Sequence, residues 1–293
     1  MRSPSLLESV RAYVEVTKPA SVLLLLFTGL AAMIVAAGGM DLPPGLLARL
    51  LPALALGCAG ANTLTCYIDR DMDLVMERTR KRPIPSGRIH PPERALYWGL
   101  LLTAISLALA WTISPLVFVL ALVGFADNVL IYSLLLKRRS ALNIILGGFS
   151  GGIPVLSAWA AVRGEIDLAA LLIAAVVVLW IPNHIWNLAI FHAEDYKKVR
   201  VPMLPAIVSL EKTTRCTMAT VVLMYVLSIA LYFVADLGPI YLFTALVFGL
   251  FITVSNFLLA LHPSREKSWL MFKLSSPYLF VLFLSMVADV ILT

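Results

Sequence analysis

Nine long apolar segments dominate this chain, and each is long enough to cross the hydrocarbon core of a membrane. A helix of about 20 residues spans about 30 Å. Only 14% of the residues are charged, whereas soluble domains have about 25%. The sequence therefore predicts an all-α integral membrane protein. The nine predicted transmembrane helices are centred on residues 19–40, 46–68, 94–113, 115–136, 141–162, 168–190, 213–235, 238–261 and 269–291.

The polar connections between these segments are too short to fold as a second domain. The two longest are the loops at residues 69–93 and 191–212. We therefore expect residues 1–293 to form a single polytopic membrane domain.

Lysine and arginine are distributed unevenly between the two sides of the predicted membrane. Of the 23 such residues, all but Arg49 and Arg163 lie before the first predicted helix or around the connections that follow the second, fourth, sixth and eighth helices. These positions are all on the same side of the membrane. Because loops rich in lysine and arginine stay in the cytoplasm, the pattern predicts a multi-pass protein of the cell (plasma) membrane. Its N-terminus and the 69–93 and 191–212 loops would be cytoplasmic, with the C-terminus outside. The charge indicates an anionic substrate or lipid, and we expect no nucleic-acid partner.

The segment from Asn62 to Gly87 places acidic, amide and basic side chains directly against a predicted membrane helix. Successive helical residues turn by about 100°, so Asn62, Asp69 and Asp73 share one face while Asp71 points elsewhere. Such oxygen ligands suit Mg²⁺, which is usually held by few carboxylates together with substrate phosphates. The alternative is a solvated loop, although acidic residues next to a membrane span are costly unless they are used. The cations available for a polyanion here are Arg78, Arg80, Lys81 and Arg82.

An internal repeat with an offset of 122 residues relates the two halves of the chain. The same offset carries the first four helices onto helices five to eight, and an even number of helices gives both copies the same orientation. The prediction is two four-helix parallel repeats plus one helix around a central cavity, because substrates bind where repeats meet. The matched pairs are Asn62 with His184, Thr65 with Asn187, Asp73 with Asp195, Arg78 with Arg200 and Pro83 with Pro205.

A second polar stretch runs from Trp180 to Pro205. His184, Asn187 and Asp195 repeat the spacing of the first copy, and Asp195 is a candidate for a second metal ion. His184 lies deep in the sixth helix. It is either a neutral histidine of the core or a pocket residue that contacts substrate or ligates iron.

The fourth helix also carries polar residues in its interior. Asp127 and Asn128 fall in mid-span, and Tyr132 lies one turn from Asn128. Polar groups at that depth usually face a cavity, and the alternative is hydrogen bonding between helices. The cations at the ends of the first and fourth helices that can close over a diphosphate are Lys18, Lys137 and Arg138.

The string YIDRDMDLVMERTRKRPIPSG resembles the first aspartate-rich motif of the UbiA superfamily of intramembrane prenyltransferases. PNHIWNLAIFHAEDYKKVRVPMLP is similar to the second-half signature of its heme-farnesylating branch. TKP at Thr17–Pro19 and LLKR at Leu135–Arg138 match further landmarks. Two positions differ from the superfamily, since Thr65 stands where asparagine is usual and Ala20 where arginine is common.

The resemblance implies an Mg²⁺-dependent prenyltransferase that moves a farnesyl group from farnesyl diphosphate to a vinyl group of heme B. Addition of water then gives heme O, and diphosphate is released. The implied partners are the lipid bilayer and membrane enzymes that hand on heme. The implied metal ligands are Asp69, Asp73 and Asp195, which act in catalysis with Lys137 and His184. The residues implied in binding are Lys18, Asn62, Thr65, Arg78, Lys81, Arg82, Asn128, Tyr132, Arg138 and Asn187.

Two alternatives remain open. Prenylation of an aromatic quinone precursor or a lipid usually goes with two or more aspartates in the second motif, where this chain has EDY and a deep histidine. A transporter for an anionic metabolite often has inverted repeats, whereas this repeat is parallel.

Overall fold

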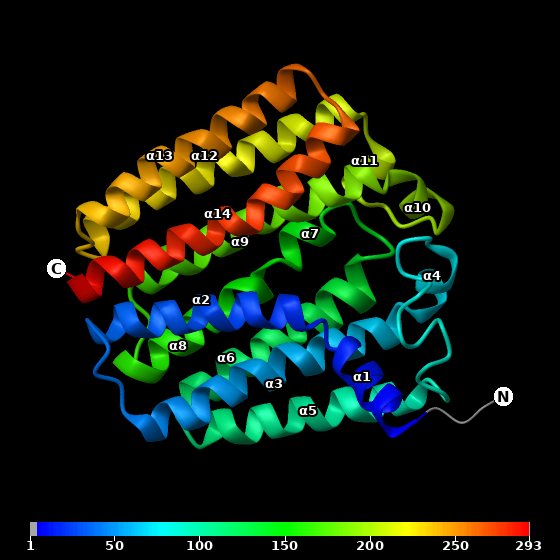
Figure 1. Ribbon diagram of the computed structural model, residues 1–293, viewed down its shortest axis with the longest axis horizontal. Helices are drawn as coiled ribbons and strands as arrows, with labels where there is room; N and C mark the ends of the chain where they lie inside the picture. The colour runs from blue at the N-terminus through cyan, green and yellow to red at the C-terminus, as the bar shows by residue number, and fades with distance from the viewer. Residues whose placement is uncertain (1–4, 293) are drawn as a thin grey trace.

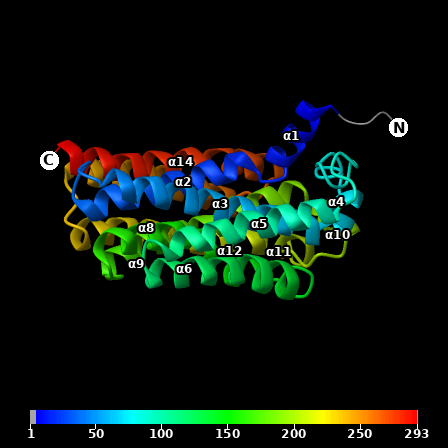
Figure 2. The ribbon, with the colours of Figure 1, turned by 90° about the horizontal axis from the view of Figure 1, so that it is seen from below.

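The computed structural model describes residues 5–292, and all regular structure in that range is helical. Figures 1 and 2 show long helices running side by side, with α1 at the end of the bundle opposite the last turn of α14. Within residues 5–292, nine spans are long and apolar enough to cross a membrane, which confirms the all-α membrane prediction. Seven of them are single α-helices: α2 (Pro19–Ala37), α3 (Pro44–Ile68), α5 (Glu93–Trp111), α9 (Leu168–Phe191), α12 (Leu210–Val234), α13 (Pro239–Leu261) and α14 (Arg265–Leu292).

The fourth and fifth spans are irregular where they face each other. The carboxylate of Asp127 accepts the backbone N–H of Ser150 at 2.7 Å, and Asn128 donates to the Ser150 hydroxyl at 3.4 Å. Backbone groups freed by a broken membrane helix need such partners, so Asp127 bonds between helices. These spans comprise α6 (Pro115–Phe125) and the π-helix η1 (Ala126–Leu136), then α7 (Asn143–Leu146), the 3₁₀ helix η2 (Phe149–Gly152) and α8 (Ile153–Arg163).

Short helices cap one end of the bundle. Figures 1 and 2 place α4 and α10 together at the end opposite the C-terminus. One residue separates each from the span before it, Asp69 after α3 and His192 after α9. α3 ends at Ile68, where the predicted span at residues 46–68 also ends, because Asp69 has φ of −87° and ψ of 0°, outside the α region. The short helices are α1 (Leu6–Glu15), α4 (Arg70–Val75), α10 (Ala193–Lys198) and α11 (Leu204–Ile207).

Glycines let several spans approach closely. A Cβ added at Gly60 would lie 2.4 Å from the Thr103 hydroxyl oxygen, where α3 meets α5. In the fifth span, one at Gly147 would lie 2.5 Å from Tyr132 and one at Gly151 2.5 Å from Ile181. Small residues at helix contacts are the usual device for close packing in membranes.

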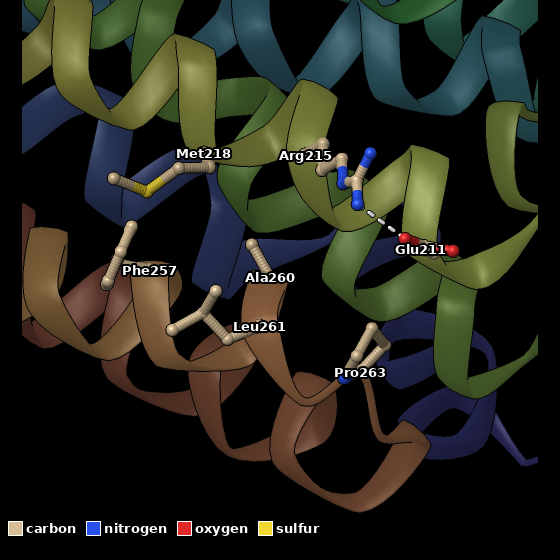
Figure 3. Close-up of a pocket in the computed structure, with 7 residues that line it drawn as sticks. All are labelled: Glu211, Arg215, Met218, Phe257, Ala260, Leu261 and Pro263. Atoms are coloured by element: carbon tan, nitrogen blue, oxygen red, sulfur yellow. Dashed lines mark hydrogen bonds and ion pairs between the residues drawn. The ribbon is translucent and has the colours of Figure 1, made fainter.

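A small pocket of about 370 Å³ lies between α12 and α13, away from the centre of the bundle (Figure 3). Its one cation, Arg215, binds the carboxylate of Glu211 at 2.5 Å. The remaining lining residues are Met218, Phe257, Ala260, Leu261 and Pro263. Because its charges pair with each other, this pocket offers no net charge to a ligand.

Candidate active site

A cavity of about 610 Å³ lies among the spans of the bundle. Residues of α2, α3, α5, α9, α14 and the irregular fourth and fifth spans surround it. Most of its wall is apolar or aromatic, with Phe125, Trp180 and Phe272 among the rings. The predicted site residues that line it are Lys18, Asn62, Thr65, Asn128, Tyr132 and His184.

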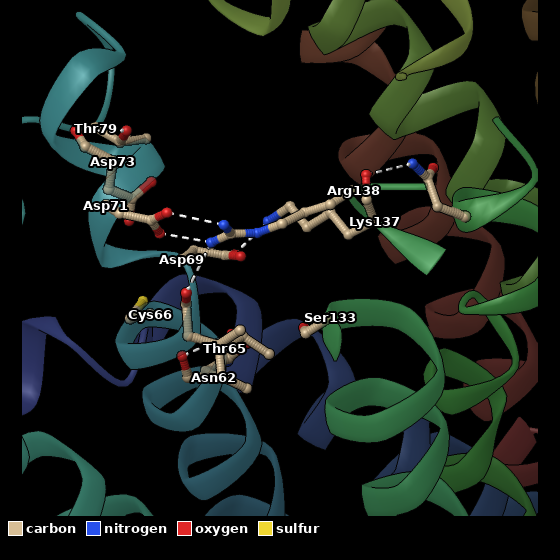
Figure 4. Close-up of polar contacts among 12 residues, drawn as sticks. Asn62, Thr65, Cys66, Asp69, Asp71, Asp73, Thr79, Ser133, Lys137 and Arg138 are labelled. Carbon is tan, nitrogen blue, oxygen red and sulfur yellow. Dashed lines mark hydrogen bonds and ion pairs between the residues drawn. The ribbon is translucent and has the colours of Figure 1, made fainter. Parts of the chain in front are cut away.

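Asp69 lies at the break between α3 and α4, where its side chain is only 5% exposed. One carboxylate oxygen, Oδ2, binds the ammonium group of Lys137 from the end of the fourth span (Figure 4). The other, Oδ1, is buried and has no hydrogen-bond partner among the described residues. A buried carboxylate oxygen without a partner is unfavourable, so Oδ1 is suited to accept a cation.

Lys137 is the cationic partner of Asp69. Burial works against protonation of its amine, but Tyr132 and the Asp69 carboxylate outweigh that effect and raise the pKa of Lys137 above its ordinary value. Lys137 is therefore protonated and lies beside Asp69, the residue between α3 and α4.

Asp73 is the second buried carboxylate of this region, at 4% exposure. Both of its oxygens accept from Nη1 of Arg82, at 2.8 and 3.1 Å. Burial opposes the charge on Arg82, yet Asp73 outweighs it and raises the pKa of the guanidinium. Asp73 thus has a cation partner in place, whereas Oδ1 of Asp69 has none in the part of the chain that the structure describes.

Asp71 points away from the other two aspartates, as the helical spacing predicts. Its carboxylate forms two hydrogen bonds with Arg138, at 2.5 and 2.8 Å, in a largely exposed position (Figure 4). The hydrogen bonds from Arg138 lower the pKa of Asp71. Arg138, predicted to contact a diphosphate, is paired on the surface and does not line the cavity.

Lys18 reaches the same region from the start of α2. Its backbone is left-handed, with φ of 56° and ψ of 67°, directly before Pro19. Such strain persists only where the surroundings impose it. The amine lines the cavity and donates to the Thr65 hydroxyl at 3.4 Å. Burial, and then the charges of Arg82 and Lys137, lower the pKa of Lys18, so three cations lie near one another.

Asn62 and Thr65 line the cavity, but neither acts on the aspartates. The Asn62 amide donates to the backbone oxygen of Thr17 at 3.0 Å, and the Thr65 hydroxyl donates to the backbone oxygen of Asn62 at 2.8 Å. That Asn62 backs the carboxylates with its amide oxygen stays a prediction, because the hydrogen bond to Thr17 is made through its N–H. This hydrogen bond fixes the turn that presents Lys18.

The second acidic stretch contacts the loop that follows α4. The carboxylate of Asp195 accepts the backbone N–H of Arg78 at 3.4 Å, and the Arg78 guanidinium donates to the Tyr196 hydroxyl at 3.3 Å. Lys81, on the same loop, is exposed. In the described part of the chain, no three His, Cys, Asp or Glu side chains are grouped to hold a metal. The predicted ligand set is therefore not gathered into a closed site.

His184 faces the cavity from α9. Its Nδ1 lies 2.7 Å from the hydroxyl oxygen of Ser275 on α14. Its ring packs between Trp180 and Phe272, with centroids 4.6 and 4.5 Å away. Asn187, predicted to bind substrate, is instead fully buried and donates to the backbone oxygen of Asn183 at 2.7 Å, away from the cavity lining.

The ninth span contributes wall residues that the sequence did not single out. Phe272 and Ser276 line the cavity, and Ser275 binds His184. The available signal was the run Ser275–Ser276–Pro277 inside an apolar segment. Ser150, which binds both Asp127 and Asn128, was also missed because nothing in the local pattern distinguishes it from other small residues.

Comparison with known proteins places this geometry in a family. Residues 25–285 match the UbiA prenyltransferase family. The chain is 54% identical to a protoheme IX farnesyltransferase of Desulforudis audaxviator over 98% of this chain and 90% of the relative.

Two solved structures share the fold. A digeranylgeranylglyceryl phosphate synthase superimposes with a TM-score of 0.81 at 18% identity, covering 98% of this chain and all of that one. A UbiA homolog from Archaeoglobus fulgidus bound to DMAPP and Mg²⁺ gives a TM-score of 0.66 at 17% identity, over 94% and 99% of the two chains. The chain therefore belongs to the UbiA prenyltransferase family, and its full-length likeness is to the protoheme IX farnesyltransferases.

Proposed function

We propose that the protein transfers the farnesyl group of farnesyl diphosphate to a vinyl group of heme B, giving heme O and diphosphate. The observation that carries this proposal is the buried Oδ1 of Asp69, which has no partner among the described residues, next to Lys137 and near Lys18 of the apolar cavity. The full-length likeness to a protoheme IX farnesyltransferase supplies the identity of the two substrates.

The carboxylates fit an Mg²⁺ site that the substrate completes. Magnesium is usually held by one or two carboxylates together with phosphate oxygens. Asp69 would offer Oδ1, Asp73 would be the second ligand by exchanging an oxygen from Arg82, and Asp195 would be the candidate for another ion. When bound, the metal withdraws charge from the diphosphate. A UbiA homolog bound to DMAPP and Mg²⁺ supports this assignment.

The cations stabilise the leaving group as the bond between C1 and the diphosphate oxygen breaks. Lys18, Arg82 and Lys137 lie near one another, and Lys137 is held protonated by its neighbours. Fixed charges aimed at developing negative charge are usually the largest electrostatic contribution to catalysis. Lys81 and Arg138 are exposed. They therefore contribute to the positive electrostatic potential on the cytoplasmic side rather than contacting the diphosphate directly.

The apolar cavity holds the farnesyl chain and keeps water from the allylic cation. The vinyl group of heme B attacks C1, a carbon–carbon bond forms, and the positive charge moves to the carbon next to the porphyrin. One water molecule adds there and loses a proton, leaving a hydroxyethylfarnesyl group. Asn128 and Tyr132 are the polar cavity residues placed to orient the reactants.

Product mass tests this proposal. Membranes that contain the protein, supplied with Mg²⁺, farnesyl diphosphate and heme B, should yield a porphyrin heavier by one farnesyl group and one hydroxyl group. Membranes without the protein are the control. Prenylation of a quinone precursor or lipid with no change in heme would contradict the assignment.

The two halves of the chain are proposed to be parallel repeats, with α14 added, in one membrane domain that spans residues 1–293. The support is the pairing of α3 with α4 and of α9 with α10, where each long helix leads through one residue into a six-residue helix. The cation distribution supports a plasma-membrane protein with the α4–α10 end in the cytoplasm. Enzymes that supply heme B or consume heme O would meet it within the bilayer.

The first prediction concerns the side of the membrane on which the two long loops lie. Cysteine introduced at Ser86 or Ser209, in a variant whose native cysteines are replaced, should react with an impermeant reagent only after the inner face is opened. Both serines are exposed. Glu165→Cys, on the opposite side, is the matched control and should react in intact cells. Labelling of Ser86→Cys or Ser209→Cys from outside would reverse the proposed orientation.

The second prediction concerns the pH dependence of the KM for farnesyl diphosphate and follows from the lowered pKa of Lys18. Its charge is lost as pH rises through that lowered value, below the ordinary lysine pKa of about 10.4. The KM for farnesyl diphosphate should therefore rise on the alkaline side before ordinary lysines titrate. Lys18→Arg, which keeps its charge, should move that rise to higher pH, whereas the exposed control Lys212→Arg should not. An unchanged KM profile in Lys18→Arg would show that Lys18 does not bind the diphosphate.

A further inference from the structure

We infer that Ser275 fixes the ring tautomer of His184 so that the unprotonated Nε2 faces the cavity as the axial ligand for the iron of the porphyrin substrate. The identity of the ligand rests on the proposed function. The tautomer is a property of the protein alone and can be measured without substrate.

The single proton of the Ser275 hydroxyl decides the direction of the hydrogen bond. That hydroxyl donates to the backbone oxygen of Phe272 at 2.7 Å. It has no second proton for His184, whose Nδ1 lies 2.7 Å from the same oxygen. The imidazole must then be the donor through Nδ1–H. A neutral imidazole has one N–H, so the lone pair is on Nε2.

Ser275 also orients the ring next to His184. The indole N–H of Trp180 donates to the backbone oxygen of Ser275 at 2.8 Å. Trp180 and His184 are one helical turn apart and stack with an interplanar angle of 24°. A single residue of α14 thus holds two adjacent rings of α9.

The packing leaves one part of the imidazole available. Trp180 covers one side of the ring, Phe272 packs against it as well, and Nδ1 is directed to Ser275. Because His184 lines the cavity, the edge that carries Nε2 is what the ring presents there. An imidazole lone pair in an apolar cavity is a good ligand for iron.

A metal-bound histidine almost always donates its other ring N–H to an acceptor, which fixes its tautomer and orientation. The Ser275 hydroxyl is such an acceptor, already in place. Ser275 is therefore a positioning residue that acts through His184. Iron ligation would hold the porphyrin in the cavity that the farnesyl chain also enters.

The first test reads the tautomer directly. Nitrogen NMR of the substrate-free protein with ¹⁵N-labelled histidine should show His184, assigned with His184→Ala, as the Nδ1–H form. Ser275→Ala should shift the signals of that residue toward a mixture of both forms. Ser276→Ala is the matched control, since Ser276 lines the cavity without bonding to His184, and it should leave them unchanged. Wild-type protein in the Nε2–H form would overturn the inference.

The second test separates iron ligation from cavity shape. Ser275→Ala should weaken binding of ferric protoheme by about 10- to 100-fold, with a changed Soret band. Metal-free protoporphyrin IX, which has no iron to ligate, should bind as it does to the wild type. Equal loss for both porphyrins would assign Ser275 to cavity shape alone and overturn the ligation.

The two hypotheses fail in different ways. If the wild-type protein makes heme O but Ser275→Ala binds protoheme unchanged, the inference fails and the proposed function stands. If the wild-type protein neither makes heme O nor binds protoheme, both fail.

Discussion

Replacing Asp69 with asparagine should lower turnover by at least about 100-fold, equivalent to about 2.7 kcal/mol of transition-state stabilisation. The substitution nearly preserves shape but removes the charge of the buried carboxylate whose Oδ1 has no partner among the described residues. An amide oxygen binds Mg²⁺ more weakly, and the variant should need more Mg²⁺ to reach its own maximal rate. Single-turnover formation of heme O across an Mg²⁺ titration measures both effects.

Two neighbouring aspartates make this prediction selective. Asp73→Asn should cause a loss of similar size, because Asp73 is also buried and is the second proposed ligand. Asp71→Asn should be much milder, because Asp71 is exposed and binds Arg138 on the surface. Equal loss at all three positions would show that the direction of the side chains does not decide the site.

Folding must be checked in the same variants, because Lys137 and Arg82 lose anionic partners. Removing one partner of a buried ion pair leaves an uncompensated charge and costs stability. Thermal unfolding in detergent, compared with the wild type, separates that loss from the loss of metal binding. A variant that unfolds at the wild-type temperature and still shows the 100-fold loss supports the metal role.

Replacing His184 with alanine should abolish heme O formation, a decrease of at least about 100-fold, or 2.7 kcal/mol. Removing the imidazole takes away the proposed iron ligand, and a misplaced acceptor by about 1 Å can cost 10²-fold in rate. Farnesyl diphosphate binding should stay within about threefold, because the carboxylates and cations lie at the break after α3 rather than beside His184. Product mass and a binding titration with farnesyl diphosphate give the two readouts.

His192 is the matched control for this substitution. It lies at the end of α9, outside the residues that line the cavity, and contacts Phe191 and Trp269 at the surface. His192→Ala should keep nearly full activity. Wild-type activity in His184→Ala would make that histidine an ordinary part of the core, and the heme assignment would then depend on family likeness alone.

The sequence by itself determined the class of protein and the residues worth examining. Apolar segments of sufficient length locate membrane helices because lipid imposes that length on every span, and within residues 5–292 the nine observed spans agree with those predicted. The spacing of Asp69, Asp71 and Asp73 also separates the exposed aspartate from the buried pair. These are local properties, fixed by residues close together in the chain.

Only the tertiary structure decided which of these residues act together. Lys137 is 68 residues from Asp69, and Ser275 is 91 residues from His184. In a membrane helix most faces are apolar, so hydropathy does not indicate which face meets which neighbour. Packing decides that Arg138 pairs with Asp71 on the surface and that Asn187 bonds to Asn183. It also decides the break between α3 and α4 at Asp69. Contacts between distant helices thus decided which of the polar residues identified in the sequence lie together and which pair elsewhere.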